Sequence, residues 1–239
     1  MKTTLKRKTI LAALMLTAGL SIGLYSCKKD NSSTSDTVTE ADAVELTTDA
    51  VVSSTGGFSV QVNSATAVYN SSALKCGVEK DSTITKASVT GATPSYSYSL
   101  KWGYVLNCSS STLTATLTGT SSYNGLNMSS TDNSSGSFTL SGLQLSSSAY
   151  TLNSTYTRNG SQTSKIGRNY SFTSNLTITS SNITVDKTTL LILSGSATVA
   201  ISGASSGGSS FTYNGTITFL GNNKATLVLN SGTTYNIQW

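Results

Sequence analysis

The chain has 239 residues, of which 37% are hydrophobic and only 10% are charged. Serine and threonine together supply 84 residues, 45 and 39 respectively, whereas histidine is absent. So few charges exclude a charge-driven disordered tail and a coiled coil. The absence of histidine removes the usual general base, histidine-based zinc sites and histidine-centred catalytic triads.

The N-terminus has the pattern of a secretory signal peptide over residues 1–26. Four basic residues lie within the first eight positions, and an apolar run from Ile10 to Leu24 follows them. This run is shorter than a comfortable membrane span. It ends in Leu24-Tyr25-Ser26-Cys27, which resembles the lipobox of bacterial lipoproteins, and the next residues, Lys28-Lys29-Asp30-Asn31, resemble the start of lipoproteins of the Bacteroidota.

This resemblance implies that the chain is cleaved before Cys27 and that the Cys27 thiol receives a diacylglycerol. The new amine would be acylated as well, for example with palmitate, and two or three acyl chains make a stable anchor. We therefore expect a protein of the cell envelope that is anchored to the outer membrane by lipid. The periplasmic and outward-facing orientations both stay open, as does the oligomeric state.

Cleavage would change the charge of the protein, because the signal peptide holds four basic residues and no acidic residue. The net charge of +5 would fall to +1 in a mature chain that begins at Cys27. The part of the chain after the signal peptide contains no cluster of basic residues typical of a phosphate-binding patch. We expect no nucleic-acid partner.

After the signal peptide, the composition divides the chain into three parts. Residues 27–38 are small and polar, as in a flexible tether. Residues 39–56 are expected to form a short helix and a linker, because Thr39 and Asp42 have capping-box spacing and Gly56-Gly57 provides a stop. Residues 57–239 are expected to form a single all-β domain without a further helix.

The predicted strands rest on alternation of apolar and polar residues. One example runs from Tyr96 to Leu106, and turn-forming sequences separate about a dozen such runs, among them Asn133–Gly136, Asn159-Gly160 and Asp186–Thr189. Short spacings favour an antiparallel meander that curls into a closed or partly open barrel, because an apolar sheet face must be covered. A two-sheet β-sandwich is the alternative.

Cys76 and Cys108 are the two cysteines that remain if Cys27 is acylated. In an oxidising envelope a disulfide between them is the expected state. Two free thiols are the alternative. No Cys-x-x-Cys motif is present, which counts against redox catalysis and a zinc knuckle.

Carboxylate catalysis requires two acidic groups in different environments. The candidates in the strand region are Glu79, Asp81, Asp132 and Asp186, but each has a local explanation in a polar loop or at a turn. No nucleophile elbow, phosphate-binding loop or calcium-binding loop is present in the sequence. We therefore expect a protein that is not an enzyme and that needs no cofactor or metal.

Three non-catalytic functions are compatible with the sequence. A carbohydrate-binding module could use the aromatic stripe Tyr96, Tyr98, Trp102 and Tyr104, although such a stripe is more often core. A carrier of a lipid or another apolar ligand would need an unfilled barrel interior. An adhesive or structural surface could use the threonine rows at 112–118 and 216–218, which also fit ordinary β-propensity on a solvated face.

Two short segments resemble the O-glycosylation signal of the Bacteroidota, in which Asp precedes Ser or Thr and then an aliphatic residue or Thr. They are Asp36-Thr37-Val38 and Asp81-Ser82-Thr83, with Thr37 and Ser82 as the acceptors. Both acceptors are expected in exposed polar segments outside the strands.

Overall fold

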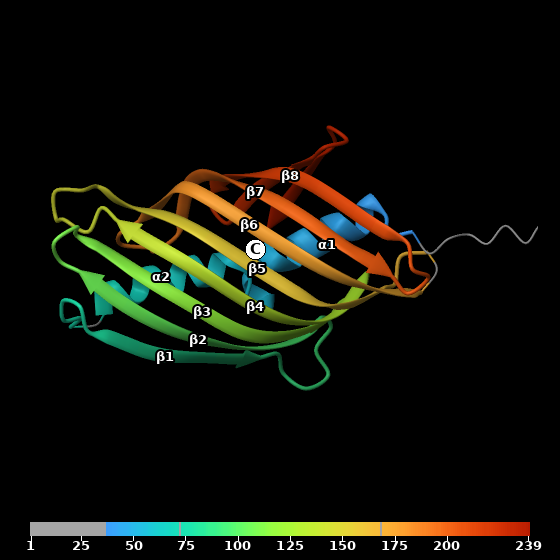
Figure 1. The fold of residues 1–239 in the computed structure, drawn as a ribbon, viewed down its shortest axis with the longest axis horizontal. Helices are drawn as coiled ribbons and strands as arrows, with labels where there is room; N and C mark the ends of the chain where they lie inside the picture. Colours follow the sequence, from blue (N-terminus) through green and yellow to red (C-terminus); the bar gives the residue numbers. More distant parts are fainter. Residues whose placement is uncertain (1–36, 72, 168) are drawn as a thin grey trace, which may run out of the picture. The chain divides into compact units, whose positions relative to one another are not determined.

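The computed structural model describes residues 37–71, 73–167 and 169–239, which form two helices followed by ten strands (Figure 1). The expected signal peptide, the acylated Cys27 and almost all of the expected tether lie outside the described residues. The helical elements are α1 (Glu40–Val51), the short 3₁₀ helix η1 (Ser53–Thr55) and α2 (Phe58–Ser71). The strands are β1 (Glu79–Ala87), β2 (Ser95–Asn107), β3 (Thr112–Asn124), β4 (Met128–Ser141), β5 (Ala149–Ser164), β6 (Tyr170–Asp186), β7 (Ile192–Ser205), β8 (Ser210–Gly221), β9 (Lys224–Leu229) and β10 (Thr234–Gln238).

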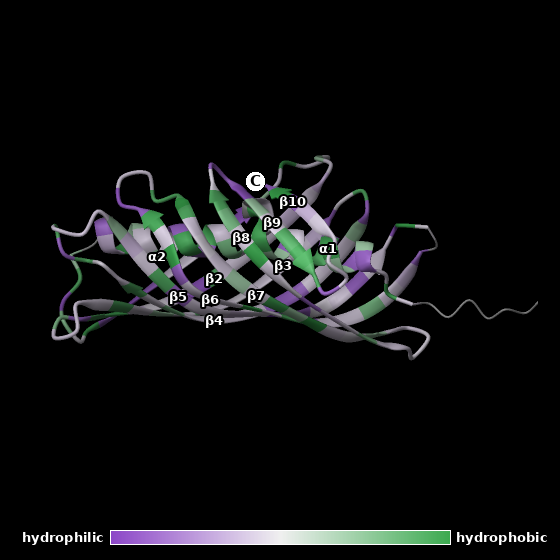
Figure 2. Ribbon diagram, turned by 90° about the horizontal axis from the view of Figure 1, so that it is seen from above, coloured by the Kyte–Doolittle hydropathy of each residue, from purple (hydrophilic) through white to green (hydrophobic). Residues whose placement is uncertain are grey.

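The ten strands form one antiparallel meander in which every strand pairs with its neighbours in sequence, from β1 to β10. The predicted meander is confirmed, but the sheet is open, since β1 and β10 are its two edges. Of the expected closed or partly open forms, the closed barrel is therefore wrong, as are the two-sheet sandwich and the count of about a dozen strands. The physical reason is that α1 and α2 lie within the curve of the sheet and cover its apolar face (Figure 2).

Helix α1 begins where the sequence predicts a helix. The Thr39 hydroxyl accepts a hydrogen bond from the Asp42 backbone N–H, and the Asp42 carboxylate accepts one from the Thr39 N–H at 2.8 Å. This reciprocal capping box satisfies two backbone donors at the helix start. Ala43, Leu46 and Ala50 are fully buried, so one face of the helix packs on the sheet.

Helix α2 contradicts the expectation of strands from residue 57 onward. Its Phe58, Val62 and Ala65 are buried at a spacing of four and then three residues, which places them on one helix face. The segment is rich in Val, Ser, Thr and Asn, which individually do not favour a helix. Burial of this apolar face against strands β4 and β5 outweighs that local preference.

The inner face of the sheet is the face that the helices cover, and it forms the core. The Phe58 ring lies between the rings of Phe138 on β4 and Phe219 on β8, with centroid distances of 6.5 and 5.7 Å. Trp102 packs on Phe138 at 5.2 Å. Contacts of this kind join α2 to strands far apart in the sheet.

Tyrosine side chains fasten the start of α1 to three different strands. The Tyr170 hydroxyl of β6 donates to the Asp42 carboxylate, and the Tyr213 hydroxyl of β8 donates to the Val38 carbonyl at 2.8 Å. The Tyr235 hydroxyl of β10 donates to Glu40 at 2.7 Å. The helix is therefore positioned by directional contacts as well as by apolar burial.

The predicted disulfide is present. Cys76, just before β1, is bonded to Cys108, in the turn after β2, with a Cα–Cα distance of 5.6 Å. The bond joins two segments 32 residues apart and links the start of the edge strand β1 to the end of its neighbour β2.

Candidate functional site

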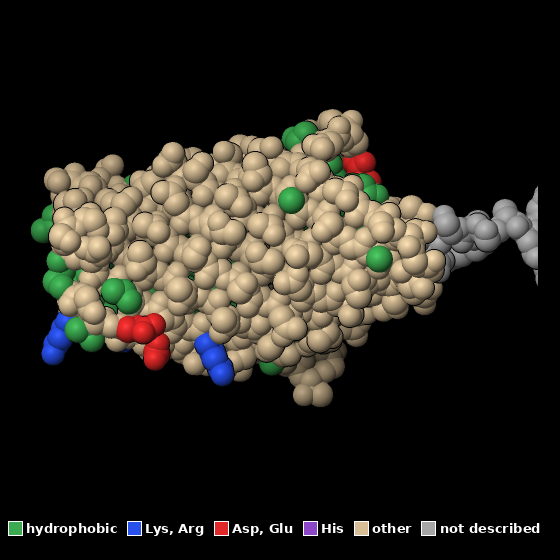
Figure 3. All heavy atoms as spheres, in the orientation of Figure 1, with side chains coloured by type: hydrophobic (Ala, Val, Ile, Leu, Met, Phe, Trp, Pro, Cys, Tyr) green, Lys and Arg blue, Asp and Glu red, His purple; other side chains and the backbone are tan. Residues whose placement is uncertain are grey.

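The outer face of the sheet, which points away from the helices, carries mainly uncharged hydroxyl side chains. Strand register aligns these side chains into rows across the sheet. One row contains six hydroxyls on consecutive strands: Thr116, Ser137, Thr155, Thr179, Thr198 and Thr216. Figure 3 shows this face as a broad neutral surface, with the visible acidic and basic side chains near its margins.

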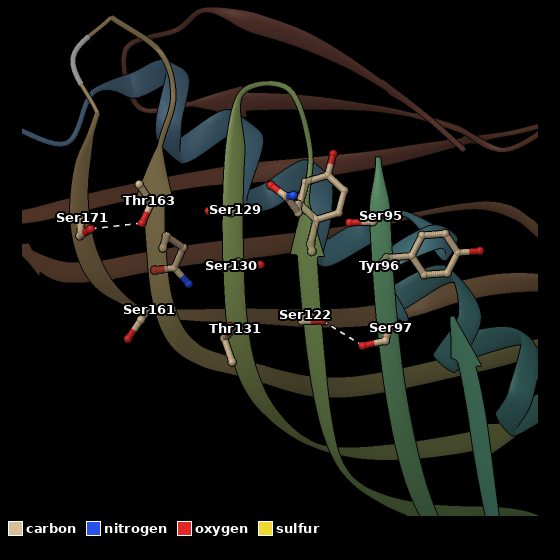
Figure 4. Close-up of a pocket in the computed structure, with 13 residues that line it drawn as sticks. Ser95, Tyr96, Ser97, Ser122, Ser129, Ser130, Thr131, Ser161, Thr163 and Ser171 are labelled. Carbon is tan, nitrogen blue, oxygen red and sulfur yellow. Dashed lines mark hydrogen bonds between the residues drawn. The ribbon is translucent and has the colours of Figure 1, made fainter. Parts of the chain in front are cut away.

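A shallow groove of about 580 Å³ crosses this outer face over strands β2 to β6 (Figure 4). We call it the outer groove. One of its sides, row 1, consists of Ser97, Ser122, Thr131 and Ser161, which are consecutive cross-strand partners. The other side, row 2, consists of Ser95, Asn124, Ser129, Thr163 and Ser171 in the same way.

The floor of the outer groove is the residue row that lies between rows 1 and 2. It consists of Tyr96, Tyr123, Ser130 and Gln162, which pair across the strands in this order. Alternation points their side chains toward the inner face. The groove is thus a gap between two rows of outward side chains, and none of its thirteen lining residues is charged.

Hydrogen bonds within the groove run along the rows. The Ser97 and Ser122 hydroxyls lie 2.9 Å apart in row 1, and those of Thr163 and Ser171 lie 3.1 Å apart in row 2. In the described part of the chain, no side-chain hydrogen bond crosses the groove from one row to the other. The floor is therefore open to a ligand, with hydroxyl groups on both sides.

A buried ionic cluster lies directly beneath the groove, on the inner face of strands β4 and β5. Arg158 donates to the Asp132 carboxylate at 2.6 Å, and Gln162 donates to the other carboxylate oxygen at 2.8 Å. The side chains of Arg158 and Asp132 are 2% and 0% exposed. Burial lowers the pKa of Arg158, but the negative charge of Asp132 and the neighbouring Tyr156 outweigh burial and raise it.

Asp49 of α1 is the third ionisable group of this cluster. Burial is the main reason that the pKa of Asp49 is raised to about 8; the charge of Arg158 opposes this rise, and the charges of Glu45 and Asp132 contribute to it. Asp49 is therefore protonated at neutral pH, so that the Asp132–Arg158 pair balances its own charge. One Asp49 carboxyl oxygen has no hydrogen-bond partner among the described residues.

The sequence interpretation missed this cluster because it placed Asp132, Asn133–Gly136 and Asn159-Gly160 in turns or loops. The structure places all of them inside strands, with Asp132 paired to Gly160 and Asn133 paired to Asn159. The sequence did contain a signal. Asp132 and Arg158 are separated by an even number of residues from the buried apolar residues of their strands, so their side chains point to the same, inner face. A charged side chain that alternation places on the buried face of a strand predicts a partner of opposite charge in the core, because charged side chains are rarely buried without one.

The other candidate carboxylates do not form a site with Asp132. Glu79 and Asp81 are exposed on β1, which is a strand and not the predicted loop. Asp186 does act at the predicted turn, where its carboxylate accepts hydrogen bonds from the backbone N–H groups of Thr188 and Thr189. These bonds, that of Thr189 foremost, lower the pKa of Asp186.

The aromatic stripe on β2 faces the core. Trp102 and Tyr104 are 2% and 0% exposed, and Tyr98 is buried as well. Burial raises the pKa of Tyr104 to about 12. Tyr96 alone is half-buried and lies at the end of the groove floor. Three of the four side chains are thus core residues.

The two proposed glycosylation acceptors differ in their surroundings. Thr37 is exposed just before α1. Ser82, in contrast, lies within β1 opposite Trp102 and is half-buried, so its predicted loop position is wrong.

Within residues 37–71, 73–167 and 169–239, no group of three or more acidic, cysteine or histidine residues could hold a metal ion. In the same ranges, no helix has the length and apolarity needed to cross a membrane. Comparison with protein-family models, with curated proteins and with solved structures finds no match to this chain.

Proposed function

We propose that this chain is a non-catalytic lipoprotein of the cell envelope that binds an uncharged glycan in the outer groove. The observation that carries this proposal is the lining of the groove, where serine and threonine hydroxyls and one asparagine amide form both sides. A volume of about 580 Å³ falls within the range of ligand sites, roughly 300–1,000 Å³.

The chemistry of the lining favours sugars over charged ligands. A serine or threonine hydroxyl both donates and accepts hydrogen bonds, as does every hydroxyl of a sugar. A phosphate or carboxylate ligand is instead recognised through Arg, Lys or a cluster of backbone donors. No charged residue lines this groove, so a neutral polyhydroxylated chain is the best chemical match.

The location in the envelope rests on separate observations. The Leu24-Tyr25-Ser26-Cys27 motif resembles a lipobox, and the disulfide between Cys76 and Cys108 is typical of proteins in oxidising compartments. Acylation of Cys27, as we propose it, would attach the domain to the outer membrane.

The structure offers less support to a carrier of apolar ligands. Such a carrier needs free space against an apolar sheet face, but side chains of α1 and α2, such as Leu46, Phe58 and Val62, occupy that face here. An adhesive role remains compatible with glycan binding, because attachment to a polysaccharide would itself be adhesion.

Binding of the purified protein to immobilised neutral and acidic polysaccharides tests the proposal. We expect retention on neutral polysaccharides that is insensitive to salt. Thr131→Arg should fill the middle of the groove and abolish retention, whereas Thr198→Arg, on the same face at β7, should not. Retention of the Thr131→Arg protein with an unchanged melting temperature would contradict the proposed site.

A further inference from the structure

We infer that the ligand of the outer groove is a linear chain that lies across the strands, with about one sugar unit for each interval between strands. This inference rests on the proposed function and specifies the shape and length of its ligand. It follows from the spacing of rows 1 and 2 and from the residues at their ends.

The direction of the ligand chain relative to the strands follows from the two spacings between side chains on one face of a β-sheet. Outward side chains of one row lie about 4.8 Å apart, whereas neighbouring rows are two residues apart along each strand, about 6.8 Å. The wider gap therefore lies between rows and runs perpendicular to the strands. A chain directed along the strands would have only the narrower gap.

The hydrogen bonds within the groove agree with this direction. The Ser97–Ser122 and Thr163–Ser171 bonds lie along the two sides and leave the floor between them uncovered. A chain on this floor would meet a hydroxyl or amide from each side at nearly every strand. The hydroxyls of Thr131 and Ser161, in row 1, have no hydrogen-bond partner among the described residues.

The length follows from where the hydroxyls of row 1 stop. Register continues the row from Ser161 to Thr173 on β6, and the next position, on β7, is Ala204. At the other end, Ser97 on β2 pairs with Ala87 on β1. Row 1 therefore has a hydroxyl on each of the five strands from β2 to β6 and an alanine beyond each end.

Five strands enclose four intervals, so the hydroxyl-bearing part of row 1 is roughly 19 Å long. An extended sugar chain advances by a distance comparable to one interval with each ring. We therefore expect affinity to rise with chain length up to about four or five units and then to remain constant, with the longest of these binding at least about tenfold more tightly than a disaccharide.

Titration calorimetry of the purified protein with oligosaccharide series tests this length dependence. The probes are β-1,4-linked glucose, β-1,3-linked glucose and β-1,4-linked mannose oligomers of one to eight units, together with their polymers. A rise followed by a plateau supports the inference. If a monosaccharide binds as tightly as the longest oligomer, the inference fails while the glycan-binding function stands. If neither polymers nor oligomers bind, both fail.

Two substitutions distinguish the middle of the groove from its end. Thr131→Arg, at the centre of row 1, should weaken binding of every oligomer. Ser97→Arg, on the last hydroxyl-bearing strand before Ala87, should shorten the plateau by about one unit and leave shorter oligomers unaffected. Thr198→Arg is the control for a charge elsewhere on the outer face. Equal losses from Ser97→Arg and Thr131→Arg at all lengths would overturn the proposed direction of the chain.

Discussion

The Asp132 carboxylate lies over Gly160, its cross-strand partner, and occupies the space that a side chain at position 160 would fill. A Cβ atom on Gly160 would lie 2.1 Å from a carboxylate oxygen of Asp132 and 2.4 Å from the Thr131 carbonyl oxygen. This empty position lets the carboxylate reach Arg158 and Gln162, which flank Gly160 two residues away on either side. The glycine is therefore required by a close approach within the sheet.

Gly160→Ala should destabilise the protein by about 1–3 kcal/mol, because the added methyl group collides with both the carboxylate and the backbone. Urea unfolding measures the change in the free energy of unfolding. Ser161→Ala, at the neighbouring outward-facing position, is the matched control and should change that free energy little. An equally small effect of both substitutions would contradict the close approach.

Asp132→Asn should cost about 3–5 kcal/mol in the free energy of unfolding, since it leaves the Arg158 guanidinium buried without a counter-charge. Arg158→Met should be costly for the same reason, and the double variant should recover part of the loss. A double-mutant cycle by urea unfolding measures this coupling. Additive effects of the two substitutions would show that the pair does not interact as the structure places it.

The protein should become less stable as the pH rises from about 4 to about 8, through the titration of Asp49. Burial raises the pKa of this carboxyl from 3.8 to about 8 in the folded protein. Between these values the folded state holds a proton that the unfolded state has lost, so the free energy of unfolding falls as the pH increases. Thermal unfolding across this range should show the trend, and Asp49→Asn should remove it.

Asp42→Asn is the control for this pH dependence, because the effect of Asp42 has the opposite sign. Burial raises the pKa of Asp42, but hydrogen bonds from Ser164, Thr39 and Tyr170 outweigh burial and lower it. The ionised Asp42 carboxylate therefore stabilises the folded protein, and this contribution to the free energy of unfolding is lost as the pH falls toward the pKa of Asp42 in the folded state. If Asp42→Asn also removed the fall in stability between about pH 4 and pH 8, the assignment of this fall to Asp49 would be wrong.

Replacement of both Cys76 and Cys108 by serine should lower the free energy of unfolding by about 4 kcal/mol according to the chain-entropy model. The loss arises because the unfolded chain is no longer closed into a loop. Comparison of urea unfolding with and without the disulfide measures it. Mass spectrometry of a non-reduced digest should show the cross-linked peptides in protein from the native envelope, and alkylation of both thiols without prior reduction would refute the bond there.

Cys27→Ala should release the protein from membranes, because the acyl chains that we propose for Cys27 could no longer be attached. Fractionation of expressing cells, with incorporation of radiolabelled fatty acid, measures both effects. A wild-type protein that never incorporates fatty acid would refute the lipoprotein proposal without affecting the glycan site.

Sequence reasoning predicts the elements whose signals are local. The capping box at Thr39 and Asp42, the alternation along β2, the turn at Asp186 and the cysteine pair are each visible within a few residues or in the residue count, and the structure contains all of them. Whether the meander closes or stays open was not predictable in this way, because closure depends on whether another element covers the apolar face.

The two main errors have a common physical cause. Helix α2 is built from residues with little helix preference, and the strands at Asn133 and Asn159 contain residues typical of turns. In both places tertiary burial decides the structure against local propensity. The groove itself was not visible in the sequence, since its sides are formed by register across five strands.

The tyrosine contacts at the start of α1 also determine how the protein would bear a mechanical load. A pull on the chain at Val38 would reach Tyr213 on β8 first, and through Glu40 and Asp42 it would reach Tyr235 on β10 and Tyr170 on β6. The force would thus be divided among three strands instead of peeling one strand from an edge. If the chain is anchored through Cys27 as we propose, this arrangement would let the helix and the sheet resist tension together.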